Sequence, residues 1–198
     1  SSSESLSPGI YNLSFYCNNS YGYGNLSRVF TLRKSKIVHD THFTNSEGLD
    51  IYFDFYFNYT SANGQLMVVP DSWSSSKDSY RAPVGNAYRD AGYSVVLVDT
   101  RGKGSSEGSR GAFLEECADI YEVIEEVRTN SAYSGYLGDR VYIWGFSAGG
   151  GRAGACSARY PDLFSAIFST GGVLNVSKWY ELNSGYRADL EARIGGTP

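Results

Sequence analysis

The chain has 198 residues, a formal net charge of −4 and 41% hydrophobic residues. This apolar content supplies a core for about one domain and excludes wholesale disorder. A mildly acidic chain without a cluster of lysines and arginines is a poor match for nucleic-acid binding, so we expect no nucleic-acid partner. The longest apolar runs, such as Val95–Val98, are far shorter than the roughly 18 residues of a membrane helix, so we expect no membrane span.

Asn-x-Ser/Thr motifs, the acceptors of N-linked glycans, recur along the chain in modest excess over chance. They favour an extracellular or cell-surface protein, and a Ser- and Asn-rich chain that meets the motif by accident is the alternative. The chain has 3 cysteines and no Cys-x-x-Cys motif, so we expect no metal site and no cofactor. The candidate glycosylation sites are Asn12, Asn18, Asn25, Asn58 and Asn175.

The N-terminal part predicts a short β-structure. Residues 1–8 form a polar, serine-rich lead that we expect to be disordered, and residues 9–34 alternate apolar and polar positions around a turn-rich centre, which predicts two strands. The stretch from Pro8 to Asn19 resembles the last hairpin of an immunoglobulin-like or PKD-type domain. Since such a β-sandwich needs about seven strands, the resemblance implies the remnant of a domain whose front is missing.

Residues 35–198 predict an α/β domain. An aromatic hairpin is expected over Ile37–Phe43 and Leu49–Tyr59, closed by the turn Asn45–Gly48. From residue 65 onward, short apolar strands alternate with helical patterns, which predicts a mostly parallel sheet covered on both faces. The expected strands are Leu66–Val69, Val95–Val98, Val141–Trp144 and Ala166–Phe168, and the expected helices are 84–91, 113–128, 149–159 and 188–193.

The sharpest signal for chemistry is the sequence Gly145-Phe146-Ser147-Ala148-Gly149. It follows an apolar strand and opens a helix rich in Gly and Ala, as a nucleophile elbow requires. The turn holds the serine at strained backbone angles, so small residues must stand two before and two after it. We therefore predict Ser147 as a catalytic nucleophile and the backbone N–H of Ala148 as an oxyanion donor. An ordinary glycine-rich turn is the alternative.

The second oxyanion donor of such a site is expected in the loop after the first inner strand. That loop contains Ser72 and Trp73, and the backbone N–H of either residue is a candidate. The indole of Trp73 is equally suited to line a pocket.

Two further motifs carry a family resemblance. Residues 99–106, Asp-Thr-Arg-Gly-Lys-Gly-Ser-Ser, resemble the Asp-x-Arg-Gly-x-Gly-x-Ser loop of α/β-hydrolases. Residues 144–150, followed by 161–164, are most similar to the prolyl-oligopeptidase and X-Pro dipeptidyl-peptidase branches of that superfamily. The resemblance covers about residues 64–172. It implies a secreted serine hydrolase, a peptidase or an esterase, that acts through an acyl-enzyme on Ser147.

The catalytic acid and base are harder to find. The triad of this fold runs Ser, Asp or Glu, then His, but both histidines, His39 and His42, precede Ser147. Their spacing of three predicts opposite faces of one strand, so we interpret them as ordinary hairpin residues. Asp162 and Asp189 are candidate acids, although a capping or turn role suits Asp162 better.

These observations lead us to expect a fragment that carries the nucleophile half of an α/β-hydrolase domain. The acid and His would lie on a following segment or a second chain, and the chain alone would be inactive. The partners would be that second element and a peptide or ester substrate. The alternative is a non-catalytic binding protein, built on a degenerate hydrolase scaffold with strand-pairing edges. We also expect Cys117 and Cys156 to be unbridged, held apart on opposite faces of the sheet.

Overall fold

The structure is a computed structural model that describes residues 9–19, 22–32, 37–57 and 65–198. The chain divides into two units, Ser1–Ser35 and Lys36–Pro198. In the first unit, β1 (Gly9–Asn19) and β2 (Gly22–Leu32) pair antiparallel along their full length. The hairpin expected over residues 9–34 is therefore present, and its strands extend into the centre that the sequence marks as turn-rich.

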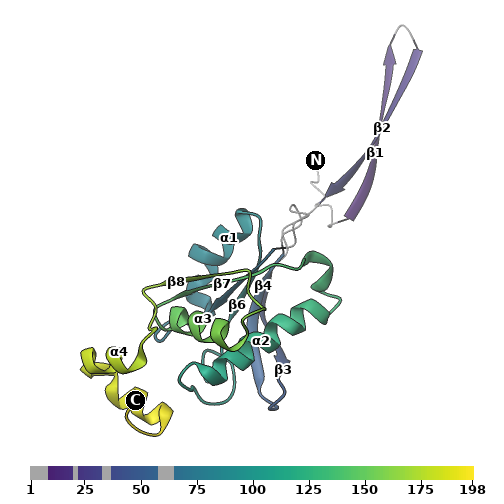
Figure 1. The fold of residues 1–198 in the computed structure, drawn as a ribbon. Helices are drawn as coiled ribbons and strands as arrows, with labels where there is room; N and C mark the ends of the chain where they lie inside the picture. The colour runs from purple at the N-terminus through teal and green to yellow at the C-terminus, as the bar shows by residue number, and fades with distance from the viewer. Residues whose placement is uncertain (1–8, 20–21, 33–36, 58–64) are drawn as a thin grey trace. The chain divides into compact units, whose positions relative to one another are not determined.

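The second unit contains a six-stranded sheet with the order β3-β4-β6-β5-β7-β8 (Figure 1). The strands β6, β5, β7 and β8 are parallel, whereas β3 and β4 form an antiparallel hairpin added to β6. This confirms the mostly parallel α/β sheet predicted from the sequence. The strands are β3 (Ile37–Thr44), β4 (Asp50–Tyr56), β5 (Leu66–Pro70), β6 (Ser94–Val98), β7 (Val141–Phe146) and β8 (Ala166–Thr170).

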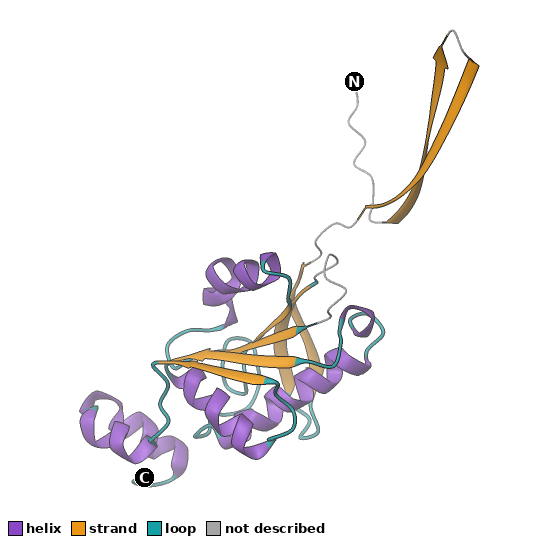
Figure 2. Cartoon of the chain, turned by 45° about the horizontal axis from the view of Figure 1, so that its top comes forward, coloured by secondary structure: helices purple, strands orange, loops and turns teal. Residues whose placement is uncertain are grey.

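Helices cover both faces of this sheet (Figure 2). The expected helices 113–128 and 149–159 are found almost as predicted, whereas 84–91 divides into the π-helical turn η2 and a short α1. Helix α4 has no counterpart in the sequence prediction. The helices are α1 (Asn86–Asp90), α2 (Leu114–Thr129), α3 (Ala148–Arg159), α4 (Val176–Leu182) and α5 (Arg187–Ile194), and the short turns are η1 (Lys77–Tyr80), η2 (Arg81–Gly85), η3 (Ser134–Tyr136) and η4 (Ser184–Tyr186).

The alternation of each strand divides the core into two layers. Side chains of β4, β6, β5 and β7 that face α2 and α3 form the larger layer, and those that face η1 and α1 form the smaller one. Buried members of the larger layer include Phe53, Phe55, Val96, Val98, Ile120, Ile124 and Ile143. The smaller layer contains Tyr56, Met67, Val69, Tyr80, Val95 and Leu97.

Cys117 and Cys156 are free, as predicted, but the reason we gave was wrong. Cys117 on α2 and Cys156 on α3 are both buried in the larger core layer, because the two helices pack side by side on one face of the sheet. Burial and a hydrogen bond with Cys117 raise the pKa of the Cys156 thiol well above its ordinary value. The pair is therefore an inert part of the core.

The expected opposite orientation of the histidines is also wrong. A β-bulge interrupts β3 between Val38 and Thr41, and Asp40 adopts a positive φ of 53° within it. The extra residue reverses the alternation. As a result, His39 and His42 contact Asp54, Tyr56 and Tyr52, alternate residues of β4 that share one face.

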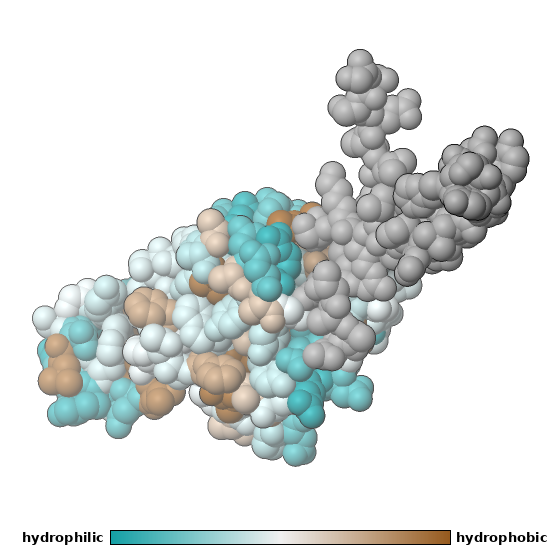
Figure 3. All heavy atoms as spheres, turned by 90° about the horizontal axis from the view of Figure 1, so that it is seen from above, coloured by the Kyte–Doolittle hydropathy of each residue, from teal (hydrophilic) through white to brown (hydrophobic). Residues whose placement is uncertain are grey.

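The face seen in Figure 3 is mixed, with polar residues and separate apolar patches. The most exposed large apolar residues include Leu174 and Leu182 near α4, and Phe146 and Phe168 on β7 and β8. None of the helices in the described ranges combines the length and apolar character of a membrane-spanning segment.

Candidate active site

Ser147 stands at the junction of β7 and α3, in the conformation expected of a nucleophile elbow. Its φ of 55° and ψ of −123° lie outside the regions that L-residues ordinarily adopt. The backbone holds this turn in place: the N–H of Ser147 donates to the carbonyl of Thr170 at 3.0 Å, and its carbonyl accepts from the N–H of Gly151 at 3.1 Å. Its side chain is half-buried and has no hydrogen-bond partner among the described residues.

The glycines around Ser147 are required by close backbone approaches. A Cβ on Gly145 would stand 2.1 Å from the carbonyl oxygen of Gly149. A Cβ on Gly149 would stand 2.8 Å from the carbonyl oxygen of Asp71. These are the positions two before and two after the serine, where the sequence analysis requires small residues. The second approach also brings the loop that follows β5 directly against the elbow.

The backbone N–H groups near Ser147 differ in availability. The N–H of Ala148 heads the 12-residue helix α3 and has no acceptor among the described residues. The N–H of Ser72 donates to the carbonyl of Ser75 at 3.0 Å and is engaged. The N–H of Trp73 has no acceptor within the described part of the chain. Two free backbone donors are therefore present, one on Ala148 in the elbow and one on Trp73 in the loop that packs against it.

A buried ion cluster joins the loop after β5 to the elbow helix. Arg152 on α3 donates from Nη1 to the carbonyl of Asp71 at 2.8 Å and lies 3.2 Å from its carboxylate. The other guanidinium nitrogen lies 3.5 Å from Glu116 of α2, and all three side chains are at most 1% exposed. Sequence reasoning missed this cluster. The sequence feature that could have revealed it is an arginine in the interior of a helix rich in Gly and Ala.

The loop after β6 also has a structural role, which Asp99 and Arg101 carry. Arg101 forms ion pairs with Asp119 and Glu47, both at 2.8 Å. Asp99 accepts the backbone N–H of Lys77 at 2.6 Å, which anchors the far end of the loop that carries Trp73. Burial raises the pKa of Asp99 from 3.8 to about 6.

The histidines lie far from Ser147. They are on β3, four strand steps from β7 in the sheet, which corresponds to roughly 19 Å at the usual strand spacing. The Nδ1 of His39 lies 2.9 Å from Asp54, so this pair is formed at the other end of the sheet. Of the candidate acids, Asp162 follows the end of α3, about 18 Å along the helix from Ser147. Asp189 is engaged in an ion pair with Arg193 at 2.8 Å.

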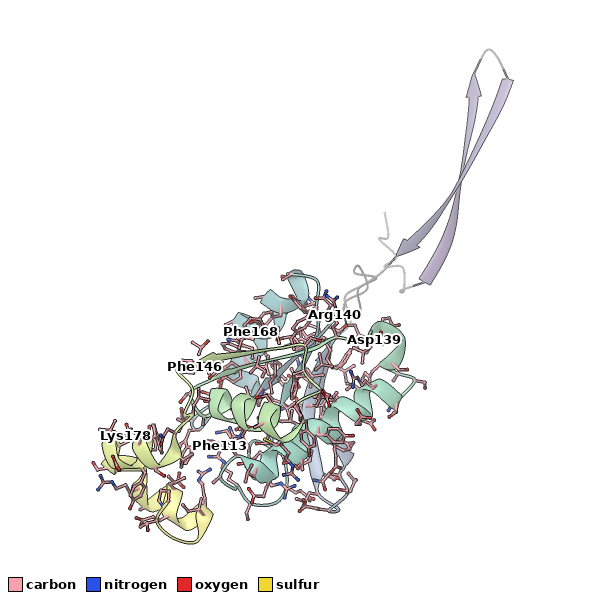
Figure 4. The ribbon with its side chains drawn as sticks, in the orientation of Figure 1. Phe113, Asp139, Arg140, Phe146, Phe168 and Lys178 are labelled. Carbon is pink, nitrogen blue, oxygen red and sulfur yellow. The ribbon has the colours of Figure 1, made fainter. Side chains whose placement is uncertain are left out.

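Aromatic and apolar side chains surround the free donors. The indole of Trp73 packs against Trp179 and Tyr186, at centroid distances of 5.5 and 5.9 Å. Phe113, which has a left-handed φ of 83°, packs with Ala148 and Val173 beside α3 (Figure 4). An apolar groove of about 370 Å³ continues from there along the small residues of α3. An apolar wall next to polar donors is typical of a small-molecule site.

Comparisons with known proteins agree with this geometry. Two curated proteins of Escherichia coli, each described as an uncharacterized 31.7 kDa protein in the traX-finO intergenic region, are 32% identical over 111 residues, which is 53% of this chain and 37% of theirs. The chain thus spans little more than a third of these relatives' length.

Solved structures share the fold at low sequence identity. The esterase Pf2001 of Pyrococcus furiosus matches with a TM-score of 0.63 and 19% identity, over 79% of this chain and 57% of the esterase. Acetyl xylan esterase 1 of Thermoanaerobacterium matches with a TM-score of 0.55 and 20% identity, over 95% of this chain and 63% of that enzyme.

A family model adds direct evidence from the sequence. The model described as "Serine aminopeptidase, S33" matches residues 74–191, which include the elbow, the loop after β6, the helices α2 to α4 and the first part of α5. The match covers more than half of the chain. The chain therefore belongs to the serine aminopeptidase S33 family of α/β-hydrolases.

Proposed function

We propose that the protein is a serine hydrolase in which Ser147 is the nucleophile. The observation that carries the proposal is the elbow itself, a non-glycine residue at φ 55° whose hydroxyl has no partner among the described residues, followed by the free N–H of Ala148 at the start of α3. In this mechanism the Oγ of Ser147 attacks the carbonyl carbon of an ester or peptide and gives its proton to a base. The N–H groups of Ala148 and Trp73 stabilise the oxyanion that forms. Departure of the alcohol or amine leaves an acyl-enzyme, which water hydrolyses.

The base and the acid are proposed to come from outside the 198 residues, on another segment of the same protein or on a second chain. The support is that both histidines of the sequence lie on β3, far from the elbow. The curated relatives are also much longer than the matched region. Without a base the hydroxyl of Ser147 stays protonated and is a weak nucleophile. We therefore expect the chain alone to be inactive.

The substrate is an ester or a peptide. The family description names an aminopeptidase, and the titles of the similar structures name esterases. The motifs around Ser147 favour the prolyl-oligopeptidase and X-Pro dipeptidyl-peptidase branches, which we keep as a proposal together with the origin of residues 9–34 in an immunoglobulin-like domain.

We also propose an extracellular location, with glycans on at least one of the five sequons. Asn175 is exposed and caps α4, where its Oδ1 accepts the N–H of Lys178 at 2.8 Å and its amide nitrogen remains available. Asn12, Asn18 and Asn25 lie on β1 and β2, and Asn58 lies outside the described residues. Intact mass of natively produced protein tests this: the bare polypeptide mass would contradict it.

A binding role without catalysis is the second candidate, because β8 is an edge strand of the sheet that the described residues form. Phe146 and Phe168 are each 49% exposed and lie together over β7 and β8, on the side of the sheet away from α3 (Figure 4). An open edge with an apolar face favours the addition of a strand from another chain.

Chemical rescue separates the two candidates. Removal of the base from a triad costs on the order of 10⁶ in turnover, so the isolated chain should hydrolyse p-nitrophenyl acetate no faster than Ser147→Ala. Free imidazole supplied as the missing base should produce a rate above that of Ser147→Ala at the same imidazole concentration. Ser157→Ala, on the same helix, should behave as the wild type.

Equal imidazole-dependent rates for wild type and Ser147→Ala would contradict the hydrolase proposal and favour the binding role. A rate without imidazole that depends on Ser147 would show a base within the chain, and His39 and His42 would be substituted next.

A further inference from the structure

Three cationic side chains meet at Trp73. The ammonium of Lys103 and the Nη1 of Arg110 each donate to the carbonyl oxygen of Trp73 at 3.1 Å. The guanidinium of Arg193, from α5, lies 3.9 Å from the centroid of the Trp73 indole. In a chain with a net charge of −4, this is a local concentration of positive charge on one residue of the candidate site.

Two of the three cations at Trp73, Lys103 and Arg110, lack counter-ions, whereas Arg193 is paired with Asp189 at 2.8 Å. Within the described residues no carboxylate lies within 4.0 Å of Lys103 or Arg110. The acids around Lys103 and Arg110 are engaged with other groups. Asp71 is bound by Arg152 and by the N–H and hydroxyl of Thr100, and the carboxylates of Asp99 and Asp189 are bound by Lys77 and Arg193.

Burial makes this excess of charge costly. Lys103 is 8% exposed, and burial together with repulsion from Arg110 lowers the pKa of its ammonium. Burial and repulsion from Arg193 lower the pKa of Arg110 in the same way. The side chain of Arg193 is 9% exposed, and its Nη1 is a fully buried donor without a hydrogen-bond partner in the described structure. Buried cations and an orphaned donor are the features that a bound anion would satisfy.

We propose that Lys103, Arg110 and Arg193 form a binding site for an anionic group of the substrate, a carboxylate or a phosphate. Lys103 is buried and Arg110 is half-buried, so we place the entry of the anion at the Arg110 guanidinium. The three cations contact the carbonyl oxygen and the indole of Trp73, whose N–H is the proposed second oxyanion donor, so an anion held there orients the rest of the substrate toward the elbow. The assignment of the anion to a substrate rests on the hydrolase function proposed for Ser147. The binding site itself does not.

Binding of small anions to the 198-residue chain tests the proposal. The three tryptophans give three indole N–H signals in a nitrogen–proton correlation spectrum, which Trp73→Phe would assign. Sodium acetate and sodium phosphate are titrated separately, with sodium chloride adjusted to keep the ionic strength constant. We expect a saturable shift of the Trp73 indole, and little shift of Trp144, which lies on β7. The anion with the smaller Kd identifies the carboxylate or phosphate class.

Substitutions localise the binding. Lys103→Met and Arg110→Met should each weaken the preferred anion at least tenfold, while Lys103→Arg and Arg110→Lys should retain most of the affinity. Lys178→Met, an exposed cation on α4, should leave the Kd unchanged. An unchanged Trp144 signal shows that each variant is folded.

Two outcomes would overturn the proposal: no saturable shift at Trp73, or equal binding in Lys103→Met, Arg110→Met and Lys178→Met. The same titration in Ser147→Ala separates this inference from the hydrolase function. Binding that survives in Ser147→Ala, in a protein that fails the imidazole test, would establish an anion site and refute only its catalytic purpose.

Discussion

Gly149 and Asp71 touch through their backbones, and this contact fixes the nucleophile relative to the loop that carries the second free donor. A Cβ on Gly149 would lie 2.8 Å from the carbonyl oxygen of Asp71, closer than real Cβ contacts allow. Because both atoms belong to the main chain, the clash can be relieved only by separating α3 from the loop. Because residue 149 is a glycine, the loop can approach α3 closely. This close approach sets the distance between Ser147 and Trp73.

Gly149→Ala should lower the free energy of unfolding by about 1–3 kcal/mol, the usual cost of overpacking a tight contact. Gly154→Ala is the matched control on the same helix, since its Cβ would meet only Cδ2 at the end of the exposed Leu174 side chain. There the better helix propensity of Ala should keep stability within about 1 kcal/mol of wild type. Urea unfolding followed by circular dichroism measures both, and an equal loss in the two variants would refute the argument.

Arg152→Met should be among the most destabilising single changes in the domain. It leaves the buried carboxylates of Asp71 and Glu116 without their cation, which typically costs about 3–5 kcal/mol. Arg159→Met, on the exposed end of α3, should cost less than about 1 kcal/mol. The unfolding midpoints of the two variants measure these losses. If Arg152→Met lowers the free energy of unfolding by less than about 1 kcal/mol, the cluster is not a charged network.

Asp99 should make stability fall between pH 4 and pH 6. Burial raises its folded pKa from 3.8 to about 6, so below pH 4 the carboxyl is protonated in both states and contributes nothing. As the pH rises, the unfolded chain loses this proton first. The unfolded state is favoured by up to about 3 kcal/mol once the pH exceeds the folded value.

Asp99→Asn removes that dependence, so the stability difference between Asp99→Asn and wild type should grow with pH over this range. The exposed Asp139→Asn is the control and should show a smaller change, because its carboxylate stays in solvent in both states. Urea unfolding at several pH values measures the effect. A stability difference that is constant, or that shrinks with rising pH, would contradict this prediction. It would show that the attraction of Lys77, which lowers the pKa of Asp99, outweighs burial, which raises it.

Cys117 and Cys156 should both titrate as free thiols. In the native protein the two are shielded, so Ellman's reagent should react with neither of them at a measurable rate. In urea without reductant both should react. In a Cys17→Ser variant, which leaves these two as the only cysteines, fewer than two thiols per unfolded chain would mean that the neighbouring sulfurs have formed a disulfide.

The sequence specified the elbow well, because a strand, a strained turn and a helix of small residues each have local signatures. It did not specify which face of the sheet each helix covers. Right-handed crossovers put α2 and α3 on the same face because the chain moves from β6 to β7 to β8 in one direction across the sheet. That direction depends on strand order, which no local pattern encodes. For this reason the contact between Cys117 and Cys156 was missed.

The histidines and the ion cluster show the same limit at the site. A spacing of three predicts opposite faces only for a regular strand, and the bulge at Asp40 depends on contacts with Lys77 and Arg81 from distant parts of the chain. Likewise, Arg152 is recognisable as unusual in its helix, but its partners come from two other elements. Local structure could be predicted here, and long-range charge pairing could not.

The bulge in β3 has a consequence for how copies of this chain can associate. The irregular backbone between Val38 and Thr41 makes β3 a poor template for a further strand, whereas β8 at the opposite side of the sheet is regular. Within the described part of the chain, β8 is thus the edge at which this six-stranded sheet can join a second copy, β8 to β8, about a two-fold axis. Such pairing closes on itself, so continuous growth of this sheet into fibres is blocked by a single inserted residue.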